Sequence, residues 1–89
     1  MDKAELQALF DRKLRDFKER DPIRGRLLEG EIAEWASMVP AAPDDTIWEM
    51  LYSQIQSIAR RQKVSEEQVI NDLFDPGSVN SFMMLIQLA

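Results

Sequence analysis

Hydrophobic residues recur every three to four positions along most of the chain, which is the spacing of one face of an α-helix. Five segments show this spacing, and proline, glycine and helix-capping residues separate them. The pattern predicts an all-α fold, a compact bundle of four to five helices without a sheet, at about residues 2–20, 22–38, 45–63, 65–74 and 78–88. We find no internal repeat and no Ser/Gly-rich linker, so we expect one helical domain over residues 1–89.

Most of these segments begin or end at a recognisable signal. The spacing of a capping box occurs at Asp2 with Glu5, Thr46 with Glu49, and Ser65 with Gln68. Asp21-Pro22 provides a cap followed by proline at the first helical position, where the missing N–H costs nothing. The Val-Pro-Ala-Ala-Pro segment at 39–43 and the Asp-Pro-Gly segment at 75–77 are predicted to interrupt the helices.

The segments differ in how much apolar surface they offer. Segment 45–63 has the most regular apolar pattern and is predicted to be the central helix. Segment 2–20 carries a narrow apolar stripe on a highly charged helix, so we expect it to be peripheral or to cross to a second subunit. The buried face of segment 22–38 is expected to contain Ile23, Leu27, Leu28, Ile32, Ala33, Trp35 and Ala36.

Two glycines lie within segment 22–38. Gly25 and Gly30 each weaken a helix by about 1 kcal/mol relative to alanine. Either a neighbouring element packs close to them, or the helix breaks near Gly30. The sequence leaves both alternatives open.

The composition argues against catalysis. The chain has no histidine and no cysteine, so it lacks imidazole bases, Cys-His pairs and the usual zinc ligands. It also contains no glycine-rich phosphate-binding motif and no calcium-loop pattern. We therefore predict no enzyme activity, no catalytic, cofactor-binding or metal-binding residue, no cofactor and no small-molecule substrate.

The same composition is typical of a small globular protein. Apolar residues make up 45% of the chain and charged residues 30%. The N-terminal segment has no hydrophobic signal-peptide core, and the longest apolar run, residues 82–86, is far too short to span a membrane. Because the chain also has no cysteine, we expect a cytoplasmic protein without membrane contact.

Charge is distributed unevenly along the chain, whose net charge is −5. Residues 12–26 hold seven basic and three acidic side chains, a local charge of +4, whereas residues 27–59 hold six acidic side chains and no basic one. A second basic cluster contains Arg60, Arg61 and Lys63. If the fold brought the two basic clusters together, they would form a site for phosphate or an acidic partner.

The residues around this second cluster resemble the two-helix core of helix-turn-helix DNA-binding proteins. Matches in type and spacing occur at Ala59, Val64, Ser65 and Val69. The resemblance implies a recognition helix starting after Ser65. However, Lys63 replaces a favoured glycine, and that helix would carry Glu66, Glu67, Asp72 and Asp75, which disfavours DNA binding.

The C-terminal segment is hydrophobic on nearly all sides, so another surface must cover it. Its candidate partner-binding residues are Phe82, Met83, Met84, Leu85, Ile86 and Leu88. We therefore predict a small acidic protein-interaction module, such as an adaptor, inhibitor or regulatory subunit, that forms a homodimer or binds a protein partner. The alternatives are a helix-turn-helix-like DNA-binding regulator using residues 55–74, and an acidic nucleic-acid mimic whose Glu29, Glu31 and Glu34 block a DNA- or RNA-binding protein.

Overall fold

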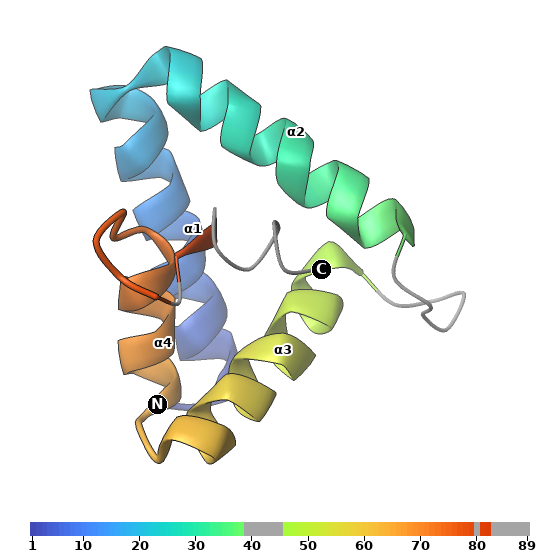
Figure 1. Ribbon diagram of the computed structural model, residues 1–89, viewed down its shortest axis with the longest axis vertical. Helices are drawn as coiled ribbons and strands as arrows, with labels where there is room; N and C mark the ends of the chain where they lie inside the picture. The colour runs from blue at the N-terminus through green and yellow to red at the C-terminus, as the bar shows by residue number, and fades with distance from the viewer. Residues whose placement is uncertain (39–45, 80, 83–89) are drawn as a thin grey trace.

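In the computed structural model, the described residues of the chain fold into four α-helices (Figure 1). The structure describes residues 1–38, 46–79, 81 and 82. The helices are α1 (Lys3–Arg20), α2 (Pro22–Met38), α3 (Ile47–Gln62) and α4 (Glu66–Leu73). No β-strand occurs in the described residues, so the all-helical prediction is confirmed.

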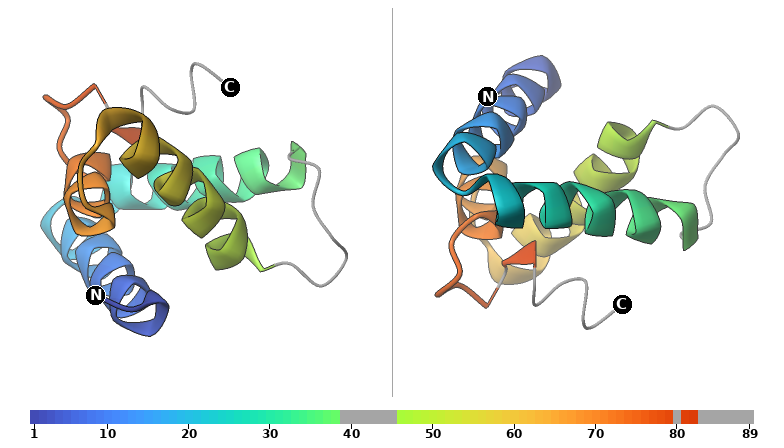
Figure 2. Two further views of the ribbon diagram at one scale, coloured as in Figure 1. Left: turned by 90° about the horizontal axis from the view of Figure 1, so that it is seen from below. Right: turned by 90° about the horizontal axis from the view of Figure 1, so that it is seen from above.

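The helices form a bundle with one long helix at its centre. The first helix, α1, packs extensively against both α2 and α4, whereas α3 packs mainly against α4. Figures 1 and 2 show α2 crossing the end of the bundle that holds the C-terminus of α1, while the α3–α4 corner lies at the opposite end, near the N-terminus. The described part of the bundle thus has two distinct ends.

The helices begin where the local capping signals predicted. The Asp2 carboxylate accepts a hydrogen bond from the backbone N–H of Glu5 at 2.8 Å, and the Glu5 carboxylate accepts one from the N–H of Asp2 at 3.2 Å. Similar caps link Asp21 to the N–H of Arg24, Thr46 to that of Glu49, and Ser65 to that of Gln68. These side chains satisfy N–H groups that have no partner within their own helix.

The corner between α1 and α2 depends on Gly25. A Cβ atom at this position would lie 2.7 Å from both the Cα and the Cγ atom of Lys18 in α1. Glycine therefore allows the two helix backbones to approach closely. By contrast, α2 continues through Gly30 without a break. Of the two alternatives left open by the sequence, close packing of a neighbour therefore applies at Gly25, and the helix does not break at either glycine.

The α3–α4 corner is a short turn with one left-handed residue. Lys63 has φ 56° and ψ 43°, and its backbone N–H donates to the carbonyl of Ala59. The next N–H, from Val64, donates to the same carbonyl at 3.1 Å. Glycine is the usual residue in this conformation, which explains the glycine preference at this position in helix-turn-helix proteins.

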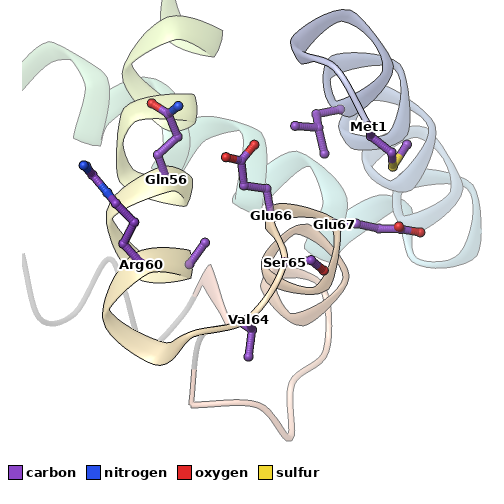
Figure 3. A pocket seen from close by; sticks show the side chains of 9 residues that line it. Met1, Gln56, Arg60, Val64, Ser65, Glu66 and Glu67 are labelled. Atoms are coloured by element: carbon purple, nitrogen blue, oxygen red, sulfur yellow. The ribbon is translucent and has the colours of Figure 1, made fainter.

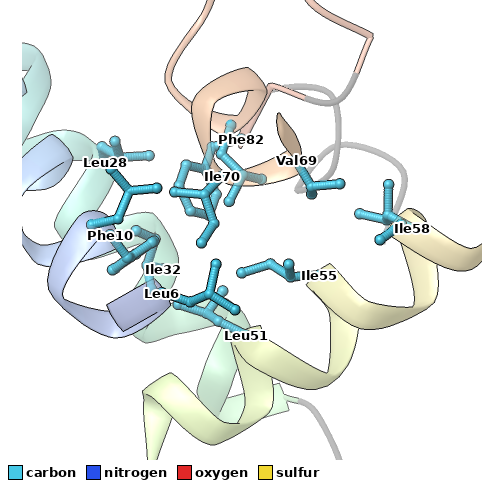
Figure 4. Close-up of a cluster of buried hydrophobic side chains, with 13 residues drawn as sticks. Leu6, Phe10, Leu28, Ile32, Leu51, Ile55, Ile58, Val69, Ile70 and Phe82 are labelled. Atoms are coloured by element: carbon cyan, nitrogen blue, oxygen red, sulfur yellow. The ribbon is translucent and has the colours of Figure 1, made fainter. Parts of the chain in front are cut away.

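The hydrophobic core draws side chains from all four helices (Figure 4). Its aromatic centre is Phe10, whose ring centroid lies 5.5 Å from Trp48, 5.6 Å from Phe74 and 6.0 Å from Phe82. Such tilted and edge-on ring pairs stabilise a core beyond the area that they bury. A ring from α1 thus connects α3 with the segment that follows α4.

The predictions about helix position are correct only in part. The first helix is not peripheral, because Leu6, Leu9 and Phe10 are buried and Phe10 fills the space between α3 and the residues after α4. The third helix, predicted to be central, supplies Leu51, Ile55, Ile58 and Ala59 to the core but packs mainly against α4. A narrow stripe suffices for α1 because large side chains on it reach two neighbours.

A third prediction, the buried face of α2, is correct only in part. Leu28, Ile32 and Ala36 are buried, and Trp35 is half-buried. Ile23, Leu27 and Ala33, however, are exposed. The predicted fifth helix at 78–88 lies outside the described residues except for positions 78, 79, 81 and 82.

Candidate protein interface

The second helix carries large apolar side chains on the side that faces away from the bundle. Ile23, Leu27 and Met38 are 76%, 62% and 69% exposed, respectively. Gly30 and Glu34 lie on the same side, because residues three or four positions apart share one side of a helix and positions 23, 27, 30, 34 and 38 follow this spacing. We call the side formed by Ile23, Arg26, Leu27, Gly30, Glu34 and Met38 the outer face of α2.

An apolar groove adjoins this outer face at Leu27. It has a volume of about 390 Å³ and lies between α2, α1 and the segment that follows α4. Phe17, Leu28, Phe74 and Phe82 form its apolar wall, and it carries two charged side chains from α2, Arg24 and Glu31. Together, the groove and the outer face extend the exposed apolar surface around one flank of α2.

A second, more polar cleft lies at the other end of the molecule. It has a volume of about 460 Å³ and is formed where the α3–α4 corner meets the start of α1. Figure 3 shows Gln56 and Arg60 of α3 on one side of this cleft and Met1 on the other, with Glu66 between them. The acidic first turn of α4 therefore lines a cleft with mixed charge.

Glu66 also affects the single tyrosine of the chain. Desolvation, and to a smaller extent the charge of Glu66 and a hydrogen bond to its carboxylate, raise the pKa of the Tyr52 phenol. The Lys3 ammonium lies over the same ring, 5.2 Å from its centroid, within the range of a cation–π contact. Tyr52 thus remains protonated at neutral pH and connects the starts of α1 and α4.

The two basic clusters lie at opposite ends of the bundle. Arg60, Arg61 and Lys63 are exposed at the α3–α4 corner, close to the N-terminus of α1. The cluster at 12–26 occupies the C-terminal half of α1 and the start of α2. Since α1 is 18 residues long, about 27 Å, the fold does not create the combined phosphate site that we considered.

The burial of residues around the α3–α4 turn agrees with the helix-turn-helix resemblance, but the charges of α4 oppose DNA binding. Ala59 and Val69 are buried on either side of the turn, as the resemblance implies, but Val64 is 39% exposed. The first turn of α4 presents the carboxylates of Glu66 and Glu67. A DNA phosphate backbone would be repelled by this turn.

The acidic residues considered for nucleic-acid mimicry have different surroundings. Glu29 lies 3.0 Å from the ammonium of Lys18, whereas Glu31 lines the apolar groove. Glu34 belongs to the outer face of α2, where no ion pair is found within the described residues. Glu29 therefore lies on the side of α2 next to α1, whereas Glu31 and Glu34, three residues apart, lie next to each other away from it.

The remaining candidates concern the C-terminal segment. Phe82 is only 4% exposed and packs in the core of its own chain, so it contributes little exposed area although it lines the groove. The other predicted partner-binding residues lie outside the described residues and stay a prediction. They are Met83, Met84, Leu85, Ile86 and Leu88.

The described part of the chain offers neither a metal cluster nor a membrane span. Among its residues, no three His, Cys, Asp or Glu side chains gather closely enough to hold a metal ion. Within the same residues, no helix combines the length and the hydrophobicity that a membrane crossing requires.

Comparison of the chain with protein-family models, curated proteins and solved structures finds no match. The function is therefore inferred from the residues of this chain alone. The outer face of α2 was missed by the sequence analysis, which assigned Ile23 and Leu27 to the core. A signal was present, because these two residues and the pair Leu28 and Ile32 cannot all face one neighbour on a single helix.

Proposed function

We propose that this chain is a small acidic protein-interaction module that acts by burying the outer face of α2 against a protein partner. The observation that carries this proposal is the exposure of Ile23, Leu27 and Met38 on one side of a single helix. Burying an exposed side chain of this size stabilises a complex by about 1.5 to 3 kcal/mol, so a few such residues can anchor an interface.

The charges around this surface determine the orientation in which a partner can bind. Arg24 and Arg26 lie near the start of α2, whereas Glu29, next to its middle, and Glu31 and Glu34, in its second half, carry the opposite charge. A partner with the opposite order of charges is attracted, and one with the same order is repelled. The surface therefore favours binding, with selection by charge, over chemical catalysis.

Affinity capture from an extract of the native host tests this function. We expect wild-type protein to retain a protein partner and the double variant Ile23→Asp with Leu27→Asp to lose it, because two carboxylates cannot be buried in an apolar interface. Val79→Asp is the matched control, since Val79 is 73% exposed but lies outside α2. An identical set of captured proteins for wild type and double variant would contradict the proposal.

DNA binding through the α3–α4 corner is a second candidate function. The left-handed conformation of Lys63 is consistent with it, because glycine, which helix-turn-helix proteins favour at this position, adopts that conformation most readily. It predicts an affinity that falls steeply with salt and that decreases when Arg60→Ala and Arg61→Ala are combined. Absence of a mobility shift with mixed-sequence DNA at low salt would reject it.

A further inference from the structure

We propose that the outer face of α2 binds a second copy of this chain, with the two α2 helices antiparallel and crossing at Gly30. This inference rests on the proposed function and identifies the partner. Three features of the outer face support it: a mid-helix glycine without a neighbour, an opposed order of charges, and exposed apolar side chains on both sides of the crossing point.

Gly30 is the first feature. A Cβ atom at this position would meet no described atom within 4 Å, so packing among the described residues does not explain the glycine. It nevertheless weakens α2 by about 1 kcal/mol relative to alanine. A second helix that crosses here could approach the α2 backbone closely, as α1 does at Gly25, where a Cβ atom would lie 2.7 Å from Lys18.

The position of Gly30 also suits a two-fold axis. Gly30 is the middle residue of Pro22–Met38, with eight residues on each side. An antiparallel crossing at this residue pairs the two helices over their whole length. A residue that precedes Gly30 by a given number of positions then lies opposite the residue that follows Gly30 by the same number of positions in the second copy.

Charge complementarity selects the antiparallel arrangement. Arg26 precedes Gly30 by four residues and Glu34 follows it by four, so each Arg26 lies across from Glu34 of the second copy. Both side chains are exposed, and neither makes an ion pair within the described residues. A parallel arrangement would instead place like charges together, which is unfavourable.

The exposed apolar residues fit the same register. Leu27, three residues before Gly30, and Ala33, three residues after it, are both exposed and flank the crossing point on opposite sides. Ile23 precedes Gly30 by seven residues and comes close to Met38 of the second copy, eight residues beyond its Gly30. Each end of the crossing thus buries apolar side chains from both chains.

The size of the contact predicts its strength. A helix of 17 residues is about 25 Å long, so one pair of such helices forms a small interface. Interfaces of this size belong to weak or transient complexes. We therefore expect a dimer with a dissociation constant in the micromolar range, visible as a mass that rises with protein concentration.

Sedimentation velocity of the full chain at several concentrations, with charge-reversed variants, tests the proposal. Arg26→Glu places two carboxylates across from each other in both symmetric pairs, and Glu34→Arg does the same with two guanidinium groups. We expect each single variant to dimerise at least about tenfold more weakly than wild type. Arg15→Glu, a charge reversal in α1 and outside the outer face of α2, should leave the dimer unchanged.

Mixing the two single variants provides the decisive measurement. In the mixed dimer, the carboxylate introduced at position 26 of one chain lies across from the guanidinium introduced at position 34 of the other. The second pair joins the native Arg26 of one chain to the native Glu34 of the other, so both pairs are again attractive. We expect the mixture, and also the double variant, to regain dimerisation to within about threefold of wild type. Because unfolded chains could not restore each other, this result also excludes misfolding as the cause of the single-variant effect.

Two results would overturn the self-association. One is a monomer at all concentrations up to about 1 mM, where even a weak dimer forms; the other is a dimer that responds equally to Arg15→Glu and Arg26→Glu. If the protein is monomeric but the variant with Ile23→Asp and Leu27→Asp still loses a captured partner, the proposed function stands and only the identity of the partner is wrong. If neither dimerisation nor capture occurs, both fail.

Discussion

The two faces of α2 carry similar apolar residues but have different surroundings. Leu28 on the inner face is 8% exposed, whereas its neighbour Leu27 on the outer face is 62% exposed. The two glycines show the same contrast, because a Cβ atom would clash with α1 at Gly25 and would meet no described atom at Gly30. The inner face thus stabilises the fold of the chain, and the outer face is available for binding.

Truncation of the two adjacent leucines should show the largest difference between the faces. Leu28→Ala removes a buried side chain and leaves a cavity, so we expect it to lower the free energy of unfolding by about 2 to 5 kcal/mol. Leu27→Ala should change it by less than about 0.5 kcal/mol, because most of that side chain is already in water. Urea unfolding followed by circular dichroism measures both. Equal losses for the two variants would show that the outer face is covered within the chain.

The inner glycine provides the next largest effect. Gly25→Ala forces a methyl group against the Lys18 backbone at 2.7 Å, so α1 and α2 must move apart. We expect a net loss of about 1 to 3 kcal/mol in the free energy of unfolding, despite the higher helix propensity of alanine. Chemical denaturation checks this value. A stabilised Gly25→Ala variant would mean that the helices are not in close contact at this point.

This contrast shows which parts of the fold can be predicted from sequence. The helix starts at Asp2, Pro22 and Ser65 were predicted because a cap is a local interaction between residues three apart. The corner at Val64 and Ser65 was located for the same reason, although α3 ends one residue earlier than expected, at Gln62. Local signals of this kind need no knowledge of the rest of the chain.

The burial of each helix face could not be predicted in this way. Apolar residues occur on both sides of α2, so the pattern alone did not show that Ile23 and Leu27 are exposed. Likewise, the narrow stripe of α1 gave no indication that Phe10 contacts three other aromatic rings. These properties depend on the neighbours that each helix meets in three dimensions, and the candidate interface is therefore a result of the structure.

The outer glycine should respond in the opposite direction to the inner one. Gly30→Ala adds a methyl group in open space and raises helix propensity, so we expect the monomer to become more stable by about 0.5 to 1 kcal/mol. Thermal and urea unfolding at low protein concentration measure this gain. In sedimentation experiments at high concentration, the same methyl group should weaken self-association. A variant that loses monomer stability would indicate an unrecognised contact at Gly30.

The smallest effect is expected where the two faces meet, at the ion pair between Lys18 of α1 and Glu29 of α2. Their charged atoms lie 3.0 Å apart, but the side chains are 40% and 43% exposed, so solvent screens their attraction. A double-mutant cycle with Lys18→Gln and Glu29→Gln should give a coupling energy of no more than about 0.5 kcal/mol, and this value should decrease as salt is added. Glutamine at position 18 retains the Cγ atom that lies over Gly25, so the cycle measures charge and not packing. A coupling energy several times larger, or one insensitive to salt, would show that electrostatics and not apolar contact hold α2 against α1.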